Sequence, residues 1–182
     1  NCWLPEEIAL LKDTTDTQIL LREPTGTDGA DVWKLVQDCA PLDENSMYCN
    51  LLQCKHFSST SVIAVDEANQ DVLGFISGYI KPKDPDTLFI WQVAVSEKAR
   101  GQGLAKKMLL DILNRDEESQ LSYLETTITD DNPGSWALFG SLAKELKTEL
   151  VRSPEFTKEL HFQGSHDTEN LVRVGPFSMG AA

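Results

Sequence analysis

The stretch that runs from residue 88 to residue 114 constrains the fold of this chain more than any other. Its first eight residues, Leu88–Val95, are nearly all apolar, which predicts a strand buried on both faces of a sheet. A polar turn and the glycine-containing segment Arg100–Ala105 follow, and from Leu104 onward apolar residues recur at helical spacing. A strand, a glycine-rich turn and a helix start favour an anion-binding site, because glycines let the backbone approach a ligand and the helix N-terminus carries partial positive charge.

The glycine spacing separates this segment from two common phosphate-binding motifs. The dinucleotide-binding pattern G-x-G-x-x-G fails because Lys106 stands where the third glycine is required, and the chain contains no G-K-[ST] run. What remains is R-x-x-G-x-A after a V-A-V strand, which resembles the pyrophosphate-binding loop of the GCN5-related N-acetyltransferase superfamily. The alternative is an ordinary tight turn between a strand and a helix.

This resemblance implies that acetyl-CoA is a co-substrate. Arg100–Ala105 would hold the pyrophosphate of coenzyme A, and the backbones of Val93 and Val95 would pair with its pantetheine arm like an added strand. The cofactor-binding residues that the resemblance implies are Val93, Ala94, Val95, Arg100, Gly101, Gln102, Gly103, Leu104, Ala105, Asn132, Ser135 and Phe139.

The length and charge of the chain indicate a single domain that does not bind nucleic acid. The 182 residues suffice for one domain with a core, and the formal net charge of −13 argues against nucleic acid, because phosphate contacts need clustered Lys and Arg. An acidic surface attracts cationic molecules, which favours an amine substrate. The chain has neither an apolar run of about 18 residues nor a leader at its start, so no membrane association is predicted. Since Asn1 is not Met, a leader removed before it stays open.

The cysteines point to a reducing compartment. Cys2, Cys39, Cys49 and Cys54 lack zinc-ligand spacing, so no metal site is predicted. The last three lie among apolar residues and are interpreted as reduced core thiols of a cytoplasmic protein.

The pattern of apolar residues predicts a mixed α/β domain over residues 18–177, between an N-terminal arm (1–17) and a tail (178–182). Strands are predicted at Gln18–Glu23, Ser61–Val65, Val72–Ile80, Leu88–Val95, Leu121–Ile128 and Leu171–Val174. Helices are predicted from Asp28 to about Ala40, from Asn45 or Ser46 to Phe57, from Leu104 to Asn114 and from Asn132 to about Leu146. Residues 81–86 and 151–170 are expected to be loops. This order matches the acetyltransferase fold, in which helices flank a twisted mixed sheet and two central parallel strands splay apart to admit coenzyme A.

The implied reaction needs a group that takes a proton from an ammonium, and Glu125 is the candidate. It shares one face of a strand with Thr127, and a carboxylate within a central strand is costly unless it faces a cleft or a partner. The alternative for Glu125 is a buried ion pair. Trp91 shares parity with Val93 and Val95, which predicts that it points to the acceptor side of the cofactor, unless it is part of the core.

The chain departs from the superfamily at the position of the usual general acid. In that superfamily an Asn at the start of the helix after the second central strand is often followed, seven residues on, by a Tyr that protonates the thiolate. Here Asn132 is followed by Phe139. Solvent, Tyr48 or Tyr123 could protonate the thiolate in place of the missing tyrosine, or the reaction uses no acid.

Four further segments are jointly more distinctive than the cofactor motif. They are P-L-D-x-N-S-x-Y at Pro41–Tyr48, Trp91–Val95, Leu124–Ile128 and His166–Glu169. Together they resemble the L-2,4-diaminobutyrate acetyltransferases of ectoine biosynthesis in salt-tolerant bacteria, over roughly residues 18–177. The resemblance implies acetyl transfer to the 4-amino group of L-2,4-diaminobutyrate by a cytoplasmic homodimer.

Such a substrate carries two ammonium groups and one carboxylate. The predicted catalytic residues are Glu125, Tyr48 and His166, and the predicted substrate-binding residues are Asp43, Asn45, Ser46, Tyr48, Trp91, Glu125 and Thr127. Asp43 and Glu125 supply negative charge, whereas His166 would act as a proton acceptor or donor near neutral pH unless it is merely exposed. The alternative for residues 43–48 is a helix-capping loop.

Two other functions stay open. One is acetylation of another small amine, such as ornithine, lysine or a polyamine. The other is a coenzyme A-binding module without catalysis, which Phe139 in place of the tyrosine suggests.

Overall fold

The computed structural model describes residues 17–115 and 120–180, so nearly all of the predicted N-terminal arm (1–17) lies outside the described residues. One seven-stranded sheet runs in the order β1-β2-β3-β4-β5-β7-β6. Its strands are β1 (Ile19–Arg22), β2 (Val62–Asp66), β3 (Val72–Lys81), β4 (Asp84–Val95), β5 (Tyr123–Ile128), β6 (Leu150–Phe156) and β7 (Glu169–Val174). The α-helices are α1 (Gly29–Asp38), α2 (Met47–His56), α3 (Leu104–Leu113) and α4 (Pro133–Glu145).

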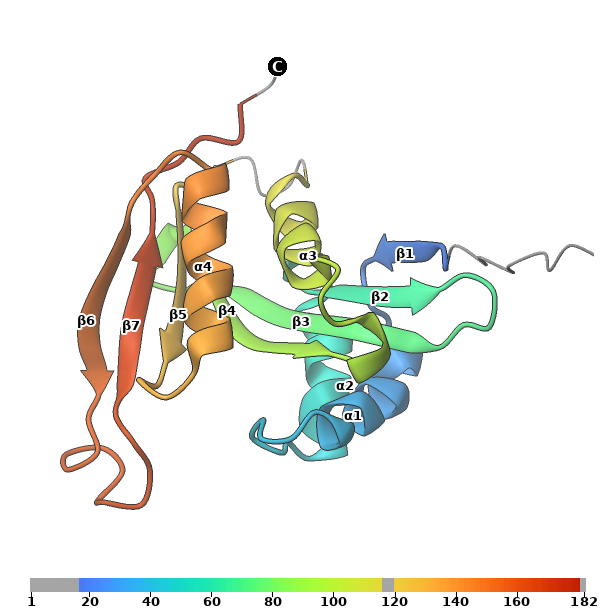
Figure 1. The fold of residues 1–182 in the computed structure, drawn as a ribbon, viewed down its shortest axis with the longest axis horizontal. Coiled ribbons are helices and arrows are strands. Elements are labelled where there is room, and N and C mark those ends of the chain that lie inside the picture. The colour runs from blue at the N-terminus through green and yellow to red at the C-terminus, as the bar shows by residue number, and fades with distance from the viewer. Residues whose placement is uncertain (1–16, 116–119, 181–182) are drawn as a thin grey trace, which may run out of the picture.

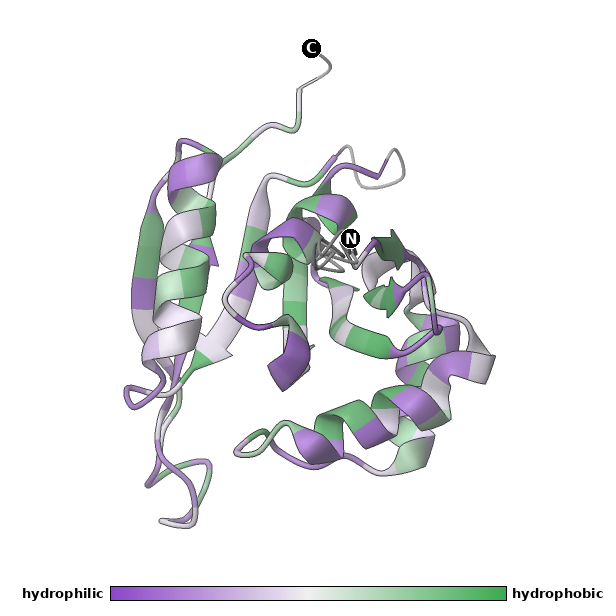
Figure 2. Cartoon of the chain, turned by 45° about the vertical axis from the view of Figure 1, so that its right-hand side comes forward, coloured by the Kyte–Doolittle hydropathy of each residue, from purple (hydrophilic) through white to green (hydrophobic). Residues whose placement is uncertain are grey.

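Two helix pairs cover the two faces of the sheet, α1 and α2 on one and α3 and α4 on the other (Figure 1). Along β2, Val62 and Ala64 belong to the core beneath α3 and α4, whereas Ile63 and Val65 belong to the core beneath α1 and α2. Alternate side chains of a strand point to opposite faces, so an apolar run without alternation is buried on both sides. Figure 2 shows both hydrophobic and hydrophilic residues around the helices, as amphipathic packing requires. The predicted mixed α/β fold is confirmed.

The two central parallel strands separate along their length. β4 and β5 pair only through Thr87–Phe89 and Tyr123–Glu125, after which β4 continues beside β3 and β5 continues beside β7. At the point of separation the Thr126 hydroxyl donates to the Ile90 carbonyl at 3.0 Å. This splay opens a gap in the middle of the sheet.

A β-bulge at Trp91 reverses the side-chain alternation of β4. Ser77 pairs with Gln92 and Gly78 pairs with Ile90, so Trp91 is the extra residue. The prediction that Trp91 shares a face with Val93 and Val95 is therefore wrong. The expected burial on both faces also fails at this residue, because Trp91 is 47% exposed.

The predicted loop 151–170 contains a strand that the sequence did not indicate. β6 pairs antiparallel with β7 at the edge of the sheet, and all its residues after Leu150 are exposed. An edge strand exposed on both faces needs no apolar alternation and tolerates a proline such as Pro154. The predicted loop 81–86 is likewise a tight turn, because β4 begins at Asp84 and Lys81 pairs with Asp84.

Candidate active site

A cavity of about 280 Å³ lies where β4 and β5 separate, and we call it the splay cavity. It reaches from the α4 side of the sheet to the loop between α1 and α2 and to the segment before β7. Nine predicted site residues line it: Asp43, Asn45, Trp91, Val93, Thr127, Asn132, Ser135, Phe139 and His166. The fold thus brings together residues from five separate parts of the chain.

Two residues of the predicted Asp43–Tyr48 group lie outside the splay cavity. Ser46 caps α2, because its hydroxyl accepts a hydrogen bond from the Cys49 amide at 3.1 Å. Tyr48 lies on the first turn of α2 with 69% of its surface exposed and does not line the cavity. The helix-capping alternative therefore holds for Ser46, and the catalytic role of Tyr48 stays a prediction.

Glu125 is held in a buried ion pair. It is 2% exposed, its Oε2 accepts from Lys81 Nζ at 2.7 Å, and its Oε1 accepts from the Arg173 guanidinium. The hydrogen bond to Glu125 raises the pKa of Lys81. Arg173 also stacks over the Tyr123 ring, 3.6 Å from its centroid. Both carboxylate oxygens face cations, so the geometry matches the ion-pair alternative and contradicts a free carboxylate beside a substrate amine.

Two acidic side chains face the splay cavity, Asp43 from the α1–α2 loop and Glu169 from the first position of β7. Burial raises the pKa of Glu169; a hydrogen bond from Thr127 and the charge of His166 oppose this shift, and the charge of Asp43 adds to it. His166 Nε2 lies 3.9 Å from Glu169 Oε1. Asp43 and Glu169 therefore bring two carboxyl groups together in a partly dehydrated site, which suits a cationic ligand.

Glu169 was not among the predicted site residues, although it lies in the distinctive segment 166–169. The sequence gives little sign that Glu169 belongs to the site, because this residue lies at the end of the predicted loop 151–170, just before a predicted strand of ordinary composition. Only the pairing of β7 with β5, in which Thr127 faces Leu171 and Ile128 faces Asn170, brings it to the cavity.

Gln92 is a second residue that the site prediction omitted. Because of the bulge at Trp91 its side chain reaches the α1–α2 loop, where Nε2 donates to the Asp43 carbonyl at 3.0 Å and Oε1 accepts from Asn45 Nδ2 at 2.9 Å. The indole of Trp33 donates to the Asn45 carbonyl at 3.0 Å. The loop that carries Asp43 is therefore fixed from two sides.

The predicted anion-binding segment has the required backbone. Gly101 and Gly103 have φ of +75° and +71°, and an ideal Cβ at either position would meet no atom within 4 Å. Gly103 is the N-cap of α3, and no side chain caps this helix. Its first N–H groups have no partner inside the helix and no side-chain cap, so they can bind a phosphate. Arg100 Nε donates to the Val95 carbonyl at 3.3 Å, which ties the segment to the end of β4.

The other predicted cofactor residues divide between the two faces of the sheet. Val93 and Val95 pack against the core beneath α3 and α4, but Ala94 is buried in the opposite core beneath α1. Asn132 caps α4 by accepting from the Ser135 amide at 3.1 Å. Phe139 is 2% exposed and forms an apolar part of the cavity wall.

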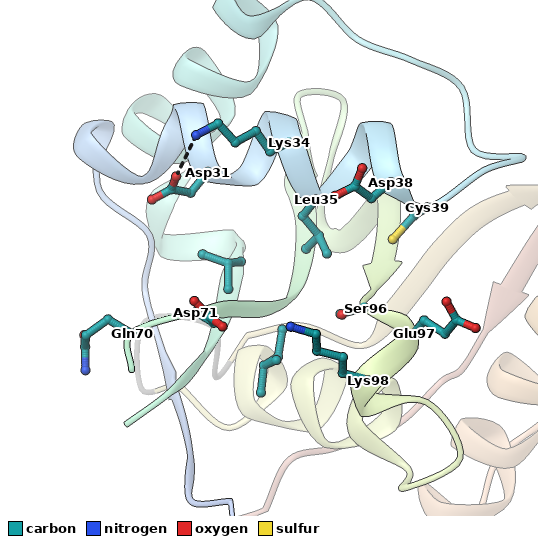
Figure 3. Close-up of a pocket in the computed structure, with 12 residues that line it drawn as sticks. Asp31, Lys34, Leu35, Asp38, Cys39, Gln70, Asp71, Ser96, Glu97 and Lys98 are labelled. Atoms are coloured by element: carbon teal, nitrogen blue, oxygen red, sulfur yellow. Dashed lines mark ion pairs between the residues drawn. The ribbon is translucent and has the colours of Figure 1, made fainter. Parts of the chain in front are cut away.

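A larger cavity of about 550 Å³ lies between α1, the β2–β3 turn and residues 96–98 (Figure 3). Its wall carries charges of both signs, including the Asp31–Lys34 ion pair at 3.7 Å, and none of the predicted site residues. Within the described residues, no three His, Cys, Asp or Glu side chains are placed to hold a metal ion. In the same part of the chain, no helix combines the length and apolar character that crossing a membrane requires.

The chain is similar to known acetyltransferases in sequence and structure. The sequence model of the Acetyltransferase (GNAT) family matches residues 30–143. The L-2,4-diaminobutyric acid acetyltransferase of Methylotuvimicrobium alcaliphilum is 53% identical over 169 residues, 92% of this chain and 97% of that protein. The protein of the same name from Vibrio parahaemolyticus is 49% identical, over 85% of this chain and 84% of its own length.

A solved structure resembles the whole described fold. Diaminobutyrate acetyltransferase EctA from Paenibacillus lautus, in complex with its substrate L-2,4-diaminobutyric acid and coenzyme A, has a TM-score of 0.83 and 36% identity, over 91% of this chain and 99% of that chain. The NatC complex bound to Gag peptide and CoA has a TM-score of 0.68 at 16% identity, which shows the shared fold alone.

Proposed function

The chain belongs to the acetyltransferase (GNAT) family, and from that premise we propose that it transfers the acetyl group of acetyl-CoA to the 4-amino group of L-2,4-diaminobutyrate, with N4-acetyl-L-2,4-diaminobutyrate as the product. The observation that carries this proposal is the splay cavity, which has Asp43 and Glu169 on its acceptor side and Asn132, Ser135 and Phe139 on its α4 side. An ammonium group of a small diamino acid fits the acidic end, and the thioester reaches the substrate through the gap between β4 and β5.

In this proposal the two substrate amines lie in different places, for a reason of charge. The attacking amine must be neutral, and neighbouring carboxylates stabilise the ammonium form by raising its pKa. Asp43 and Glu169 are therefore assigned to the 2-ammonium group, which does not react. The 4-amino group is left to face the thioester, and the imidazole of His166, beside Glu169, is the proposed acceptor of its proton.

In the proposed step the amine nitrogen forms a bond to the acetyl carbonyl carbon, and the carbon–sulfur bond breaks. The amine loses one proton and coenzyme A leaves as the thiolate. Among the described residues no tyrosine lines the splay cavity. Phe139 occupies the α4 position, Tyr48 is exposed and Tyr123 lies under Arg173. A thiolate is a fair leaving group, so the step needs no protein acid.

We also propose that the protein works as a homodimer in the cytoplasm, as the resemblance to diaminobutyrate acetyltransferases implies. Free thiols support a reducing compartment, because Cys39 and Cys54 are buried and form no disulfide with any cysteine among the described residues. Burial raises the pKa of Cys54 to about 12, so this thiol stays protonated. A molar mass by light scattering tests the dimer.

The proposed function is tested by thiol release from acetyl-CoA with diaminobutyrate, ornithine, lysine and spermidine compared side by side. We expect diaminobutyrate to be preferred at least about tenfold in kcat/KM, because one or more added methylenes displace an ammonium from the acidic pair. NMR of the product should place the acetyl group on the 4-nitrogen. If all four amines fail while acetyl-CoA still binds, the chain is a coenzyme A-binding module and the proposal is rejected.

Replacing Gln92 by leucine tests how the acidic loop is positioned. Two hydrogen bonds to the Asp43–Asn45 loop are lost, so we expect the KM for diaminobutyrate to rise about tenfold and the KM for acetyl-CoA to stay unchanged. Gln53→Leu is the matched control, because Gln53 is 1% exposed and lies on α2 outside the splay cavity. Equal kinetic effects of the two variants would assign Gln92 to stability alone.

Replacing Glu125 by glutamine separates the two predicted roles of that residue. The variant removes the charge between Lys81 and Arg173, and we expect the free energy of unfolding to fall by about 2–3 kcal/mol while kcat below the transition stays within about threefold. Chemical denaturation and thiol release measure the two quantities. Glu155→Gln, an exposed charge change on β6, is the control. A loss of kcat of about 100-fold or more with unchanged stability would restore Glu125 as the general base.

A further inference from the structure

A second cavity of about 360 Å³ adjoins the splay cavity, and we call it the aromatic cavity. Its wall includes Tyr79, Phe89, Trp91, Phe156 and Leu171. Trp91 and Thr127 line both cavities, so they stand at the boundary between them.

Trp91 is placed at this boundary by the bulge in β4. Its ring meets the ring of Tyr79 edge to face, with the ring centroids 6.4 Å apart. The centroid of the Tyr79 ring lies in turn 5.3 Å from that of Phe89 and 6.0 Å from that of Phe57. Trp91 is 47% exposed, and its indole belongs to neither of the two hydrophobic cores. Its removal therefore opens the boundary without emptying the core.

The chemistry of the aromatic cavity suits the alkyl chain of a longer acceptor. Aromatic and aliphatic walls accept methylene groups, and aromatic faces attract an ammonium. The one buried acid in the wall, Glu125, is neutralised by Lys81, which also lines the cavity, and by Arg173, so this end of the cavity favours methylene groups and not an ammonium. Glu155 adds an exposed negative charge at the rim.

We propose that Trp91 sets the length of the amine acceptor by separating the splay cavity from the aromatic cavity. This inference rests on the proposed function. With the indole in place, the acceptor must fit between the thioester and the Asp43–Glu169 pair. Without the indole, an acceptor with one or two more methylenes extends past Thr127 into the aromatic cavity.

The test compares Trp91→Ala with the wild-type protein on diaminobutyrate, ornithine and lysine. We expect the ratio of kcat/KM for lysine to that for diaminobutyrate to rise roughly tenfold or more, the factor that burial of two methylenes supplies. Adding Leu171→Trp to Trp91→Ala refills the aromatic cavity and should abolish the gain. Phe57→Ala is the control, because it removes a ring that contacts Tyr79 without lining either cavity and should leave the ratio unchanged.

The outcomes separate this inference from the proposed function. Wild-type protein that binds acetyl-CoA but does not acetylate diaminobutyrate rejects the proposed function whatever the variants do. Wild-type activity on diaminobutyrate with an unchanged ratio in Trp91→Ala rejects only the role of Trp91. If Trp91→Ala is inactive on every acceptor, Trp91→Leu is measured, and the inference stands only if the ratio rises in that variant.

Discussion

Replacing Glu169 by glutamine is expected to raise the KM for diaminobutyrate about 100-fold, because a partly buried carboxylate that pairs with an ammonium contributes roughly 2–5 kcal/mol to binding. The KM for acetyl-CoA should not change, since the proposed function places Glu169 against the acceptor and not against the cofactor. Steady-state thiol release measures both constants.

The control for Glu169→Gln is Asp167→Asn, which makes the same change of charge two residues away. Asp167 is exposed and pairs with Lys158 at 3.1 Å. We expect this control to shift the KM for diaminobutyrate less than about threefold, as for a screened surface charge. A similar rise in both variants would mean that the effect is long-range electrostatics and not a direct contact.

The same residue predicts a pH dependence. Burial raises the pKa of Glu169, so the side chain is protonated at higher pH than an ordinary glutamate. A neutral carboxyl group cannot pair with an ammonium, and the KM for diaminobutyrate in the wild-type protein should therefore rise as pH falls through this pKa. In Glu169→Gln this rise should be absent. Glutamine should also not destabilise the protein near pH 7, because a raised carboxyl pKa makes ionisation unfavourable in the folded state at that pH.

Replacing Gly103 by alanine is the second change with a large expected effect, a rise of about 30-fold or more in the Kd for acetyl-CoA. Alanine at φ of +71° costs about 1–2 kcal/mol in a left-handed conformation. Its Cβ would also enter the open space in front of the uncapped α3 N-terminus, where the pyrophosphate is expected to lie. Calorimetric titration with acetyl-CoA measures this Kd.

Gly164→Ala supplies the matched control for Gly103→Ala. Gly164 has φ of +82°, and a Cβ there also meets no atom within 4 Å, but it lies in the loop between β6 and β7. Both variants should lose similar stability, whereas only Gly103→Ala should weaken coenzyme A binding. Equal affinities in the two variants would show that the α3 N-terminus does not hold the cofactor.

The sequence by itself determined the features that depend on neighbouring residues. The strand at Leu88–Val95, the turn at Arg100–Ala105 and the helix that follows are encoded within 27 consecutive residues, and left-handed glycines with a helix start are local chemistry. The predicted order of helices and strands was confirmed apart from β6 and the start of β4, because apolar runs that are buried on one or both faces leave a period in the sequence.

Only the tertiary structure decided which carboxylate lines the splay cavity. Glu125 and Glu169 are equivalent as residue types, but Glu125 meets Lys81 and Arg173 across the sheet, whereas Glu169 reaches the cavity through the pairing of β7 with β5. The bulge at Trp91 depends in the same way on the register between β3 and β4, which no alternation within one strand reveals. The spacing of apolar residues along the chain determines which helix or strand forms. Contacts between residues far apart in the sequence determine where each charged side chain points.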